Sequence, residues 1–168
     1  MSADLMICLC AAAVVGSGLV AGVFLSFSDF VMKALASAQT ASGIEAMQLI
    51  NRRVYGSVFL SLLMGAGALC LGLMIGAVLL PLGAAGKWIM AGGLSYLLGV
   101  LLVTMICNVP MNKRLDRMSA RAGASATFWA WYANRWTQWN HLRSAAAAGS
   151  TVCFLLACLL LEPAGLTG

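Results

Sequence analysis

The sequence predicts an all-α integral membrane protein: an antiparallel four-helix transmembrane bundle with amphipathic cytoplasmic helices. Three observations lead to this fold class. First, 62% of the 168 residues are hydrophobic and only 9% are charged, whereas a soluble domain keeps roughly a quarter of its residues charged. Second, the charges lie at the edges of apolar runs that can each supply the roughly 20 residues needed to cross a bilayer core. Third, nearly all Lys and Arg residues fall in two of the connections.

The four apolar runs give the expected spans in order. No charged residue lies between Asp4 and Asp29, Arg53 and Lys87, Lys87 and Lys113, or Arg143 and Glu162. We expect spans near residues 5–27, 54–80, 88–107 and 144–161, in one domain covering residues 1–168, with a turn at Pro81, Leu82 and Gly83. Small residues four apart favour close helix packing; they are Gly18 and Gly22, Gly72 and Gly76, and Ser95 and Gly99.

The distribution of Lys and Arg sets the expected orientation. Between the first two spans lie Lys33, Arg52 and Arg53; between the last two lie Lys113, Arg114, Arg117, Arg121, Arg135 and Arg143. The opposite side carries only Lys87. By the positive-inside rule we expect a multi-pass inner (cytoplasmic) membrane protein with cytoplasmic basic loops and both termini outside. The first run lacks a basic n-region, so we interpret it as a retained span.

Composition also bounds the partners and the function classes. The net charge of +5 follows from the topology, so membrane lipids and no nucleic acid are expected; a homo-oligomer is left open. The six Cys lie inside the expected spans without a C-x-x-C pair, which argues against a thiol–disulfide exchange enzyme. The five acidic residues avoid the span centres, which argues against a proton-coupled multidrug exporter.

Polar residues gather on the basic side of three spans. Before the second span, an amphipathic helix carries Arg52 on its polar stripe, and Asn51 lies where the chain turns apolar. At the end of the third span, Thr104, Asn108 and Asn112 are four apart and share a helix face. Because Pro110 breaks the backbone hydrogen-bond ladder, two interpretations stay open. Thr104 and Asn108 repair the helix, or they line a polar pocket.

The stretch WAWYANRWTQWNHLR, residues 129–143, holds four of the five Trp and the only His. At 100° per residue one face carries Trp129, Tyr132, Trp136, Trp139, Asn140 and Arg143. An aromatic belt at the membrane surface explains the Trp and Tyr, but not the amide and the guanidinium among them. Arg143 either snorkels to lipid headgroups or faces the bundle, where a buried charge needs a partner.

These segments together predict a pocket at the cytoplasmic rim for a planar, partly apolar ligand that bears oxygen atoms. Its expected residues are Asn51, Arg52, Asn108, Asn112, Trp136, Asn140, His141 and Arg143.

The motifs "GVFLSFSDFVMKAL", "MQLINRRVYGS", "YLLGVLLVTMICNVPMNKRL" and "WYANRWTQWNHLRS" resemble the anthrone oxygenase-like membrane protein family. The resemblance covers nearly the whole chain and implies a small four-helix membrane protein. It further implies oxidation of an anthrone to an anthraquinone by molecular oxygen, with no established cofactor. Carried over by position, the family motifs fall on Asn51, Arg52, Thr104, Asn108, Pro110, Asn112, Trp136, Trp139, Asn140, His141 and Arg143.

For that chemistry His141 is the candidate base, because histidine exchanges a proton near neutral pH. Arg143, Asn140 and Asn108 are candidate catalytic donors to a developing oxyanion. The candidate substrate-binding residues are Asn51, Arg52, Thr104, Asn112, Trp136 and Trp139. A regular helix turns His141 away from the aromatic face, so the assignment needs a bend there or a different base.

No metal site and no cofactor are predicted. A single His excludes a bis-His haem within one chain, and a haem or other metal held by His141 is the remaining alternative. The alternative function is a non-catalytic membrane module that binds a quinone, a lipid or a haem, or serves as a partner subunit. Turnover of an anthrone- or quinol-like compound under oxygen distinguishes the oxygenase from the module.

Overall fold

The computed structural model describes residues 3–120, 122 and 125–161, so Arg121 and residues 162–168 lie outside the described residues. Within these ranges the regular elements are all helical. Four described stretches are long and apolar enough to cross a membrane: Asp4–Ser37, Val58–Leu79, Gly83–Asp116 and Ser125–Leu160. The predicted fold class, all-α with four membrane-length helices, is confirmed.

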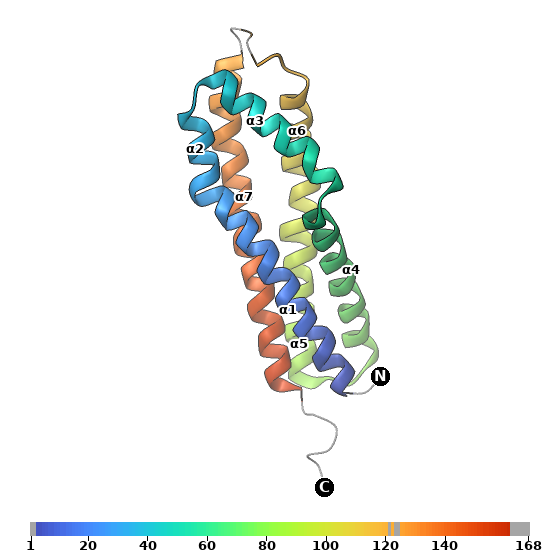
Figure 1. The fold of residues 1–168 in the computed structure, drawn as a ribbon. Helices are drawn as coiled ribbons and strands as arrows, with labels where there is room; N and C mark the ends of the chain where they lie inside the picture. The colour runs from blue at the N-terminus through green and yellow to red at the C-terminus, as the bar shows by residue number, and fades with distance from the viewer. Residues whose placement is uncertain (1–2, 121, 123–124, 162–168) are drawn as a thin grey trace.

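The first long stretch contains α1 (Ala3–Ser26), a π-helical turn η1 (Phe27–Val31) and α2 (Met32–Ser37). After α3 (Thr40–Arg53), a 3-10 turn η2 (Val54–Gly56) leads into α4 (Val58–Leu79). The third stretch contains α5 (Gly83–Leu94), the π-helical segments η3 (Ser95–Leu102) and η4 (Thr104–Asn108), and α6 (Val109–Asp116). The last helix is α7 (Ser125–Leu160). Successive long stretches run up and down the bundle, so α1 begins and α7 ends at the same end (Figure 1).

Three of the long stretches exceed the spans expected from the sequence. They have 34, 34 and 36 residues, against 22 for α4, whereas roughly 20 residues cross a bilayer core. Charged residues end the apolar runs but do not end the helices, because the helices continue with one apolar face against their neighbours. The extra turns meet at one end of the bundle, and α3 lies across them (Figure 1).

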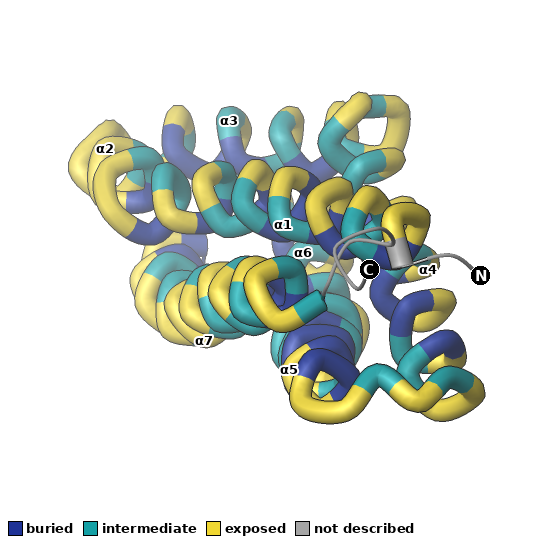
Figure 2. Tube along the Cα trace, turned by 90° about the horizontal axis from the view of Figure 1, so that it is seen from below, coloured by how far each residue is buried: buried dark blue, intermediate teal, exposed yellow. Residues whose placement is uncertain are grey.

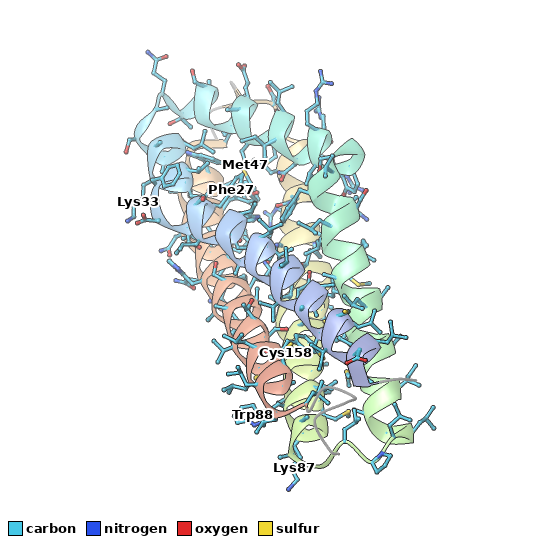
Figure 3. The ribbon with its side chains drawn as sticks, turned by 60° about the horizontal axis from the view of Figure 1, so that its bottom comes forward. Phe27, Lys33, Met47, Lys87, Trp88 and Cys158 are labelled. Carbon is cyan, nitrogen blue, oxygen red and sulfur yellow. The ribbon has the colours of Figure 1, made fainter. Side chains whose placement is uncertain are left out.

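The predicted turn between the second and third spans is present. α4 ends at Leu79, and α5 begins at Gly83, whose φ of 54° lies in the left-handed region that glycine adopts without strain. Lys87 lies at this end of the bundle and Lys33 at the other (Figure 3).

Buried side chains form two clusters, one above the other along the bundle. The bundle core includes Met6, Val20, Phe24, Leu63, Leu73, Tyr96, Val100 and Phe154. The cap core, under α3, is Met32, Ile44, Met47, Met111, Leu115, Phe128, Trp129, Tyr132 and Trp136. Viewed along the bundle, the buried residues face inward and the exposed residues form the outer surface (Figure 2).

Hydrogen bonds attach α3 to the end of α6. The Gln48 amide donates to the backbone carbonyls of Leu115 and Met118, at 2.9 Å each. Arg52 adds an ion pair with Asp116 at 2.6 Å. The polar stripe of α3 therefore adds side-chain donors and an ion pair at the end of α6 and just beyond it, and these contacts fix α3 over the cap core.

The small-residue rows differ in their surroundings. Ser95 donates a hydrogen bond of 2.8 Å to the Ala146 carbonyl, and a Cβ at Gly99 would collide with the Ala146 side chain. The row at Ser95 and Gly99 thus allows the close approach to α7. Gly22 and Gly72 have open space where a side chain would project, so close packing was the wrong interpretation for these two residues.

Candidate functional site

A cavity of about 150 Å³ lies where the bundle core meets the cap core. Its apolar wall includes Phe24 and Leu63 from the bundle core and Met47 and Trp136 from the cap core. Figure 3 shows Met47 close to Phe27, a further wall residue, between α1 and α3. Its polar lining is Asn51, Tyr55, Thr104, Asn108, Asn112 and Arg143.

Tyr55 marks the outer side of the cavity. Tyr55 is 64% exposed, while Phe59 and Leu60, in the first turn of α4, are partly buried. Tyr55 lies three residues before the first residue of α4, Val58, and amphipathic tyrosines favour the interface between membrane and water. This side of the cavity therefore lies at the level where α4 enters the apolar part of the bundle.

Arg143 is the charged residue of the cavity, and it is only 4% exposed. Its guanidinium donates from Nη1 to Thr104 Oγ1 at 3.2 Å and from Nη2 to Asn140 Oδ1 at 2.6 Å. The Cζ atom lies 4.3 Å from the centre of the Phe24 ring and 5.2 Å from that of Trp136. Arg143 therefore faces the bundle, and the snorkelling interpretation is wrong.

No described carboxylate pairs with Arg143; the ion pairs found in the described ranges are Lys33–Asp29 and Arg52–Asp116. Its Nε is buried without a partner. Cation–π contacts and neutral hydrogen-bond acceptors offset part of the cost of burying a guanidinium, but they do not neutralise its charge. Arg143 thus gives the cavity a positive charge that remains available to a ligand.

Asn140 holds Arg143 in place from α7. It is fully buried, and its Nδ2 donates to the Phe24 carbonyl at 2.5 Å and to Ser28 Oγ at 2.6 Å. With both amide hydrogens directed to the first stretch, its Oδ1 accepts from Arg143. Asn140 does not line the cavity itself, so it acts as a positioning residue.

The segment around Pro110 decides between the two interpretations of Thr104 and Asn108. In the π-helical turn η4, the Val109 N–H donates to the Thr104 carbonyl, and the Thr104 hydroxyl donates to the Val100 carbonyl at 2.7 Å. Asn108 instead donates across to the Trp136 carbonyl at 3.4 Å. Thr104 therefore bonds to its own helix and also lines the cavity, whereas Asn108 contacts α7 and does not repair the break.

A second polar network closes the cavity toward the cap core. Asn112 Oδ1 accepts from the Tyr132 hydroxyl at 2.8 Å and from Trp136 Nε1 at 3.0 Å. Asn51 donates from Nδ2 to the Tyr132 hydroxyl at 3.5 Å. These bonds fix the Trp136 indole, so the aromatic wall beside Arg143 has a defined orientation.

Besides Asn140, three of the predicted site residues are outside the lining of the cavity. His141 is exposed and borders a separate open groove with Lys33 and Gln138. The bend that would turn it inward is absent, because α7 is one continuous helix. Arg52 is exposed in its ion pair with Asp116, and Trp139 lies under the Arg135 guanidinium, 5.0 Å from ring centre to Cζ.

The sequence interpretation missed residues of the first stretch. Phe24 covers the guanidinium, Ser28 accepts from Asn140, and Phe27 lines the cavity 5.8 Å from Trp136, centre to centre. The available signals were the polar Ser28 just past the first apolar run and the motif "GVFLSFSDFVMKAL", which contains all three residues. Tyr132 was placed on the inner face, but its bond to Asn112 depends on which helices are neighbours.

The described residues contain no group of three or more His, Cys, Asp and Glu side chains that could hold a metal ion. The predicted alternative of a haem or metal on His141 would have to use this exposed side chain on the outer face.

Comparison with known families identifies the chain. The model of the anthrone oxygenase family matches residues 51–153, more than half of the sequence. This chain belongs to the anthrone oxygenase family. The family predicted from the motifs is therefore confirmed, while no curated protein and no solved structure matches the chain.

The part that matches the anthrone oxygenase model contains the polar residues of the cavity, from Asn51 to Arg143. Phe24, Phe27 and Ser28 precede that part. The residues shared with the family model thus supply the hydrogen-bonding groups, and α1 with η1 adds one aromatic wall and the anchor for Asn140.

Proposed function

We propose that this member of the anthrone oxygenase family is a membrane-embedded oxygenase. Its substrate is a planar aromatic small molecule of the anthrone or quinol class, and molecular oxygen is the oxidant. The observation that carries the proposal is Arg143, which is 96% buried beside an apolar cavity and has no carboxylate partner among the described residues. Family membership supplies the oxygenase class.

The size of the cavity supports a substrate that places one of its rings inside the cavity. An apolar cavity of about 150 Å³ can hold one benzene molecule. The cavity found here has about the same volume. A tricyclic compound therefore places one ring against Trp136 and Phe27 and extends past Tyr55. Such a ligand reaches the cavity from the membrane, where an aromatic compound partitions.

Arg143 stabilises the substrate anion in this proposal. An anthrone loses a proton from its central CH2 to give an enolate, whose charge rests largely on oxygen. A fixed cationic donor in a site of low polarity stabilises such charge strongly, because it needs no reorganisation during reaction. Thr104 and Asn140 keep the guanidinium in one position.

The oxidation then balances as follows. The enolate transfers one electron to O2, and the resulting radical and superoxide combine to form a C–O bond. The peroxide takes up the proton released earlier, and the hydroperoxide loses water to leave a second carbonyl. One anthrone and one O2 thus yield one anthraquinone and one water. The substrate anion is the electron donor, so the proposed reaction uses no metal or haem.

The base differs from the one expected from the sequence. His141 lies on the outer face, and the described lining contains no carboxylate and no imidazole. We therefore assign proton removal to water at the Tyr55 side, with the site promoting it by stabilising the anion that forms.

The proposed location is the inner membrane, with the end that carries α3 in the cytoplasm. The charges support this orientation, since Lys33, Arg52 and Arg114 belong to α2, α3 and α6 at that end, and Lys87 lies at the other end (Figures 1 and 3). The positive-inside rule then puts the start of α1 and the end of α7 outside.

Oxygen uptake by the purified protein in lipid nanodiscs tests the function. A panel of anthrones and hydroquinones should include compounds consumed with one O2 per anthrone, and product analysis should show the quinone. If no compound on the panel is consumed above the rate in empty nanodiscs, the oxygenase is rejected in favour of a binding module. An optical spectrum with metal analysis accompanies the assay, since a Soret band or stoichiometric iron or copper would contradict the metal-free reaction.

A further inference from the structure

Two buried polar atoms without hydrogen-bond partners belong to side chains that line the same cavity. They are Nε of Arg143 and Oδ1 of Asn108, whose residues are 4% and 1% exposed. In the described ranges the other buried side-chain atoms without a hydrogen-bond partner are Trp129 Nε1 and Ser150 Oγ, whose residues do not line this cavity. Since native structures rarely leave such atoms unpaired, the pair at the cavity indicates a ligand group.

The contacts of Asn108 fix which of its amide atoms is free. Its amide lies 3.4 Å from the Trp136 carbonyl, and a carbonyl oxygen only accepts hydrogen bonds. The NH2 group must therefore face Trp136, because the reverse orientation would bring two oxygens together. The free atom is the acceptor Oδ1.

The contacts of Arg143 leave a donor. Its Nη1 and Nη2 donate to Thr104 and Asn140, while the Nε–H has no acceptor. Thr104, which accepts from Arg143, and Asn108 are the first and last residues of the same turn, η4, and Arg143 and Asn108 both line the cavity. Two lining residues thus carry one free donor and one free acceptor.

A hydroxyl satisfies both atoms, because it donates and accepts at the same time. A ketone, an ether or a quinone oxygen only accepts, and would leave Asn108 Oδ1 buried without a partner. We infer that the cavity binds its ligand through an aromatic hydroxyl, which donates to Asn108 Oδ1 and accepts from Arg143 Nε. The ligand class is a phenol, or the enol tautomer of a keto compound.

This inference rests on the proposed site and sharpens its substrate class. A keto substrate such as an anthrone would be bound as its enol, which has already given up a proton of its CH2 group and forms the enolate of the proposed mechanism on loss of the hydroxyl proton. The ring that carries the hydroxyl is then aromatic and electron-rich. Selection of this tautomer prepares the ring for electron transfer to oxygen. In a quinone product the enol hydroxyl has become a carbonyl, so the product binds more weakly and leaves.

Binding of a matched pair of ligands to the unmodified protein tests the inference. The pair is 1-naphthol and 1-methoxynaphthalene, which share the ring system and differ in the O–H donor. Titration under nitrogen in nanodiscs, followed by tryptophan fluorescence and corrected for partition into empty nanodiscs, gives both Kd values. We expect 1-naphthol to bind about tenfold tighter, since an unpaired buried acceptor typically costs a factor of about that size. Equal Kd values would overturn the inference, with water as the partner of the two atoms.

Two variants locate the preference. Asn108→Leu keeps the side-chain volume and removes the acceptor, so the preference for 1-naphthol should fall to near unity. Asn134→Leu makes the same change on the exposed face of α7 and should keep the tenfold preference. If Asn108→Leu folds and keeps the preference, Asn108 is not the acceptor. If it does not fold, the comparison of ligands on the unmodified protein still decides.

The binding result and the oxygenase result fail separately. Oxygen uptake without a preference for the hydroxyl ligand removes the tautomer inference and leaves the oxygenase. A hydroxyl preference without oxygen uptake on any compound supports the ligand class and removes the oxygenase.

Discussion

The inner and outer faces of α7 carry similar polar side chains and use them differently. On the outer face Arg135 donates to Gln138, and Gln138 donates to Asn134, at 2.9 Å each. On the inner face Asn140 and Arg143 bond to the first and third stretches, through Ser28, the Phe24 carbonyl and Thr104. The outer network is local to one helix, whereas the inner one joins three long stretches.

This difference teaches where a polar residue of α7 matters. Hydrogen bonds between side chains one turn apart form wherever the helix forms, and exposed side chains can exchange these bonds for bonds to water or lipid headgroups. Partners on other helices exist only in the folded bundle, where no water replaces a lost bond. Substitutions on the inner face should therefore change both the stability of the fold and the binding of the ligand. Substitutions on the outer face should change neither.

The largest effect is expected for Arg143→Ala. It removes the cation of the cavity, and loss of one donor to an oxyanion typically lowers kcat by about 10²–10³-fold. Oxygen uptake per folded protein, with folded protein quantified by size-exclusion chromatography, measures this. Arg135→Ala, on the outer face, is the matched control and should keep its rate. An Arg143→Ala protein with normal turnover would remove Arg143 from the mechanism.

Asn140→Leu should cause the next largest change, in stability. It leaves Ser28, the Phe24 carbonyl and one Arg143 nitrogen without their partner, and unpaired buried groups cost about 1–3 kcal/mol each. We expect the free energy of unfolding to fall by about 2–4 kcal/mol. Thermal and denaturant unfolding in micelles measure it, with Asn134→Leu as the control, for which a change within about 0.5 kcal/mol is expected. Equal losses in both variants would mean that the two faces do not differ.

Arg143→Lys sharpens the comparison by keeping the charge. Lysine lacks the planar fork that contacts Thr104 and Asn140 together, so turnover should fall by about tenfold while binding of an anionic product analogue persists. Separate measurement of kcat and of the analogue's Kd distinguishes charge from geometry. Full activity in this variant would show that charge alone suffices.

The smallest effect is expected for His141→Ala. An essential general base typically contributes about 10²–10⁴-fold in rate, yet His141 lies outside the cavity. Specific activity and melting temperature should stay at the values of the unmodified protein. A loss of 10²-fold or more at normal yield would restore the imidazole as the base and require a different arrangement of α7.

Much of the fold could be predicted because membrane insertion depends on local sequence. Long apolar runs determine four helices, and glycine after Pro81 and Leu82 determines the turn at Gly83. The same locality explains the errors in the span ends. A helix continues past the apolar run wherever one of its faces packs on a neighbouring helix. At the end of α6 that neighbour is α3, which is bonded to it through Gln48. The apolar run alone does not show which helix the neighbour is.

The site divides in the same way. Helix periodicity alone places Trp136, Asn140 and Arg143 on one face and His141 on the other, and the continuous α7 has this arrangement. The choice of His141 as base followed its chemistry against that periodicity. The sequence by itself thus determined four membrane-length helices, the family and the inward face of α7. Only the tertiary structure decided that Asn108 contacts Trp136, that Phe24 and Ser28 complete the site, and that Arg143 has no carboxylate partner among the described residues. These contacts join residues far apart in the chain, and their geometry depends on how the helices pack.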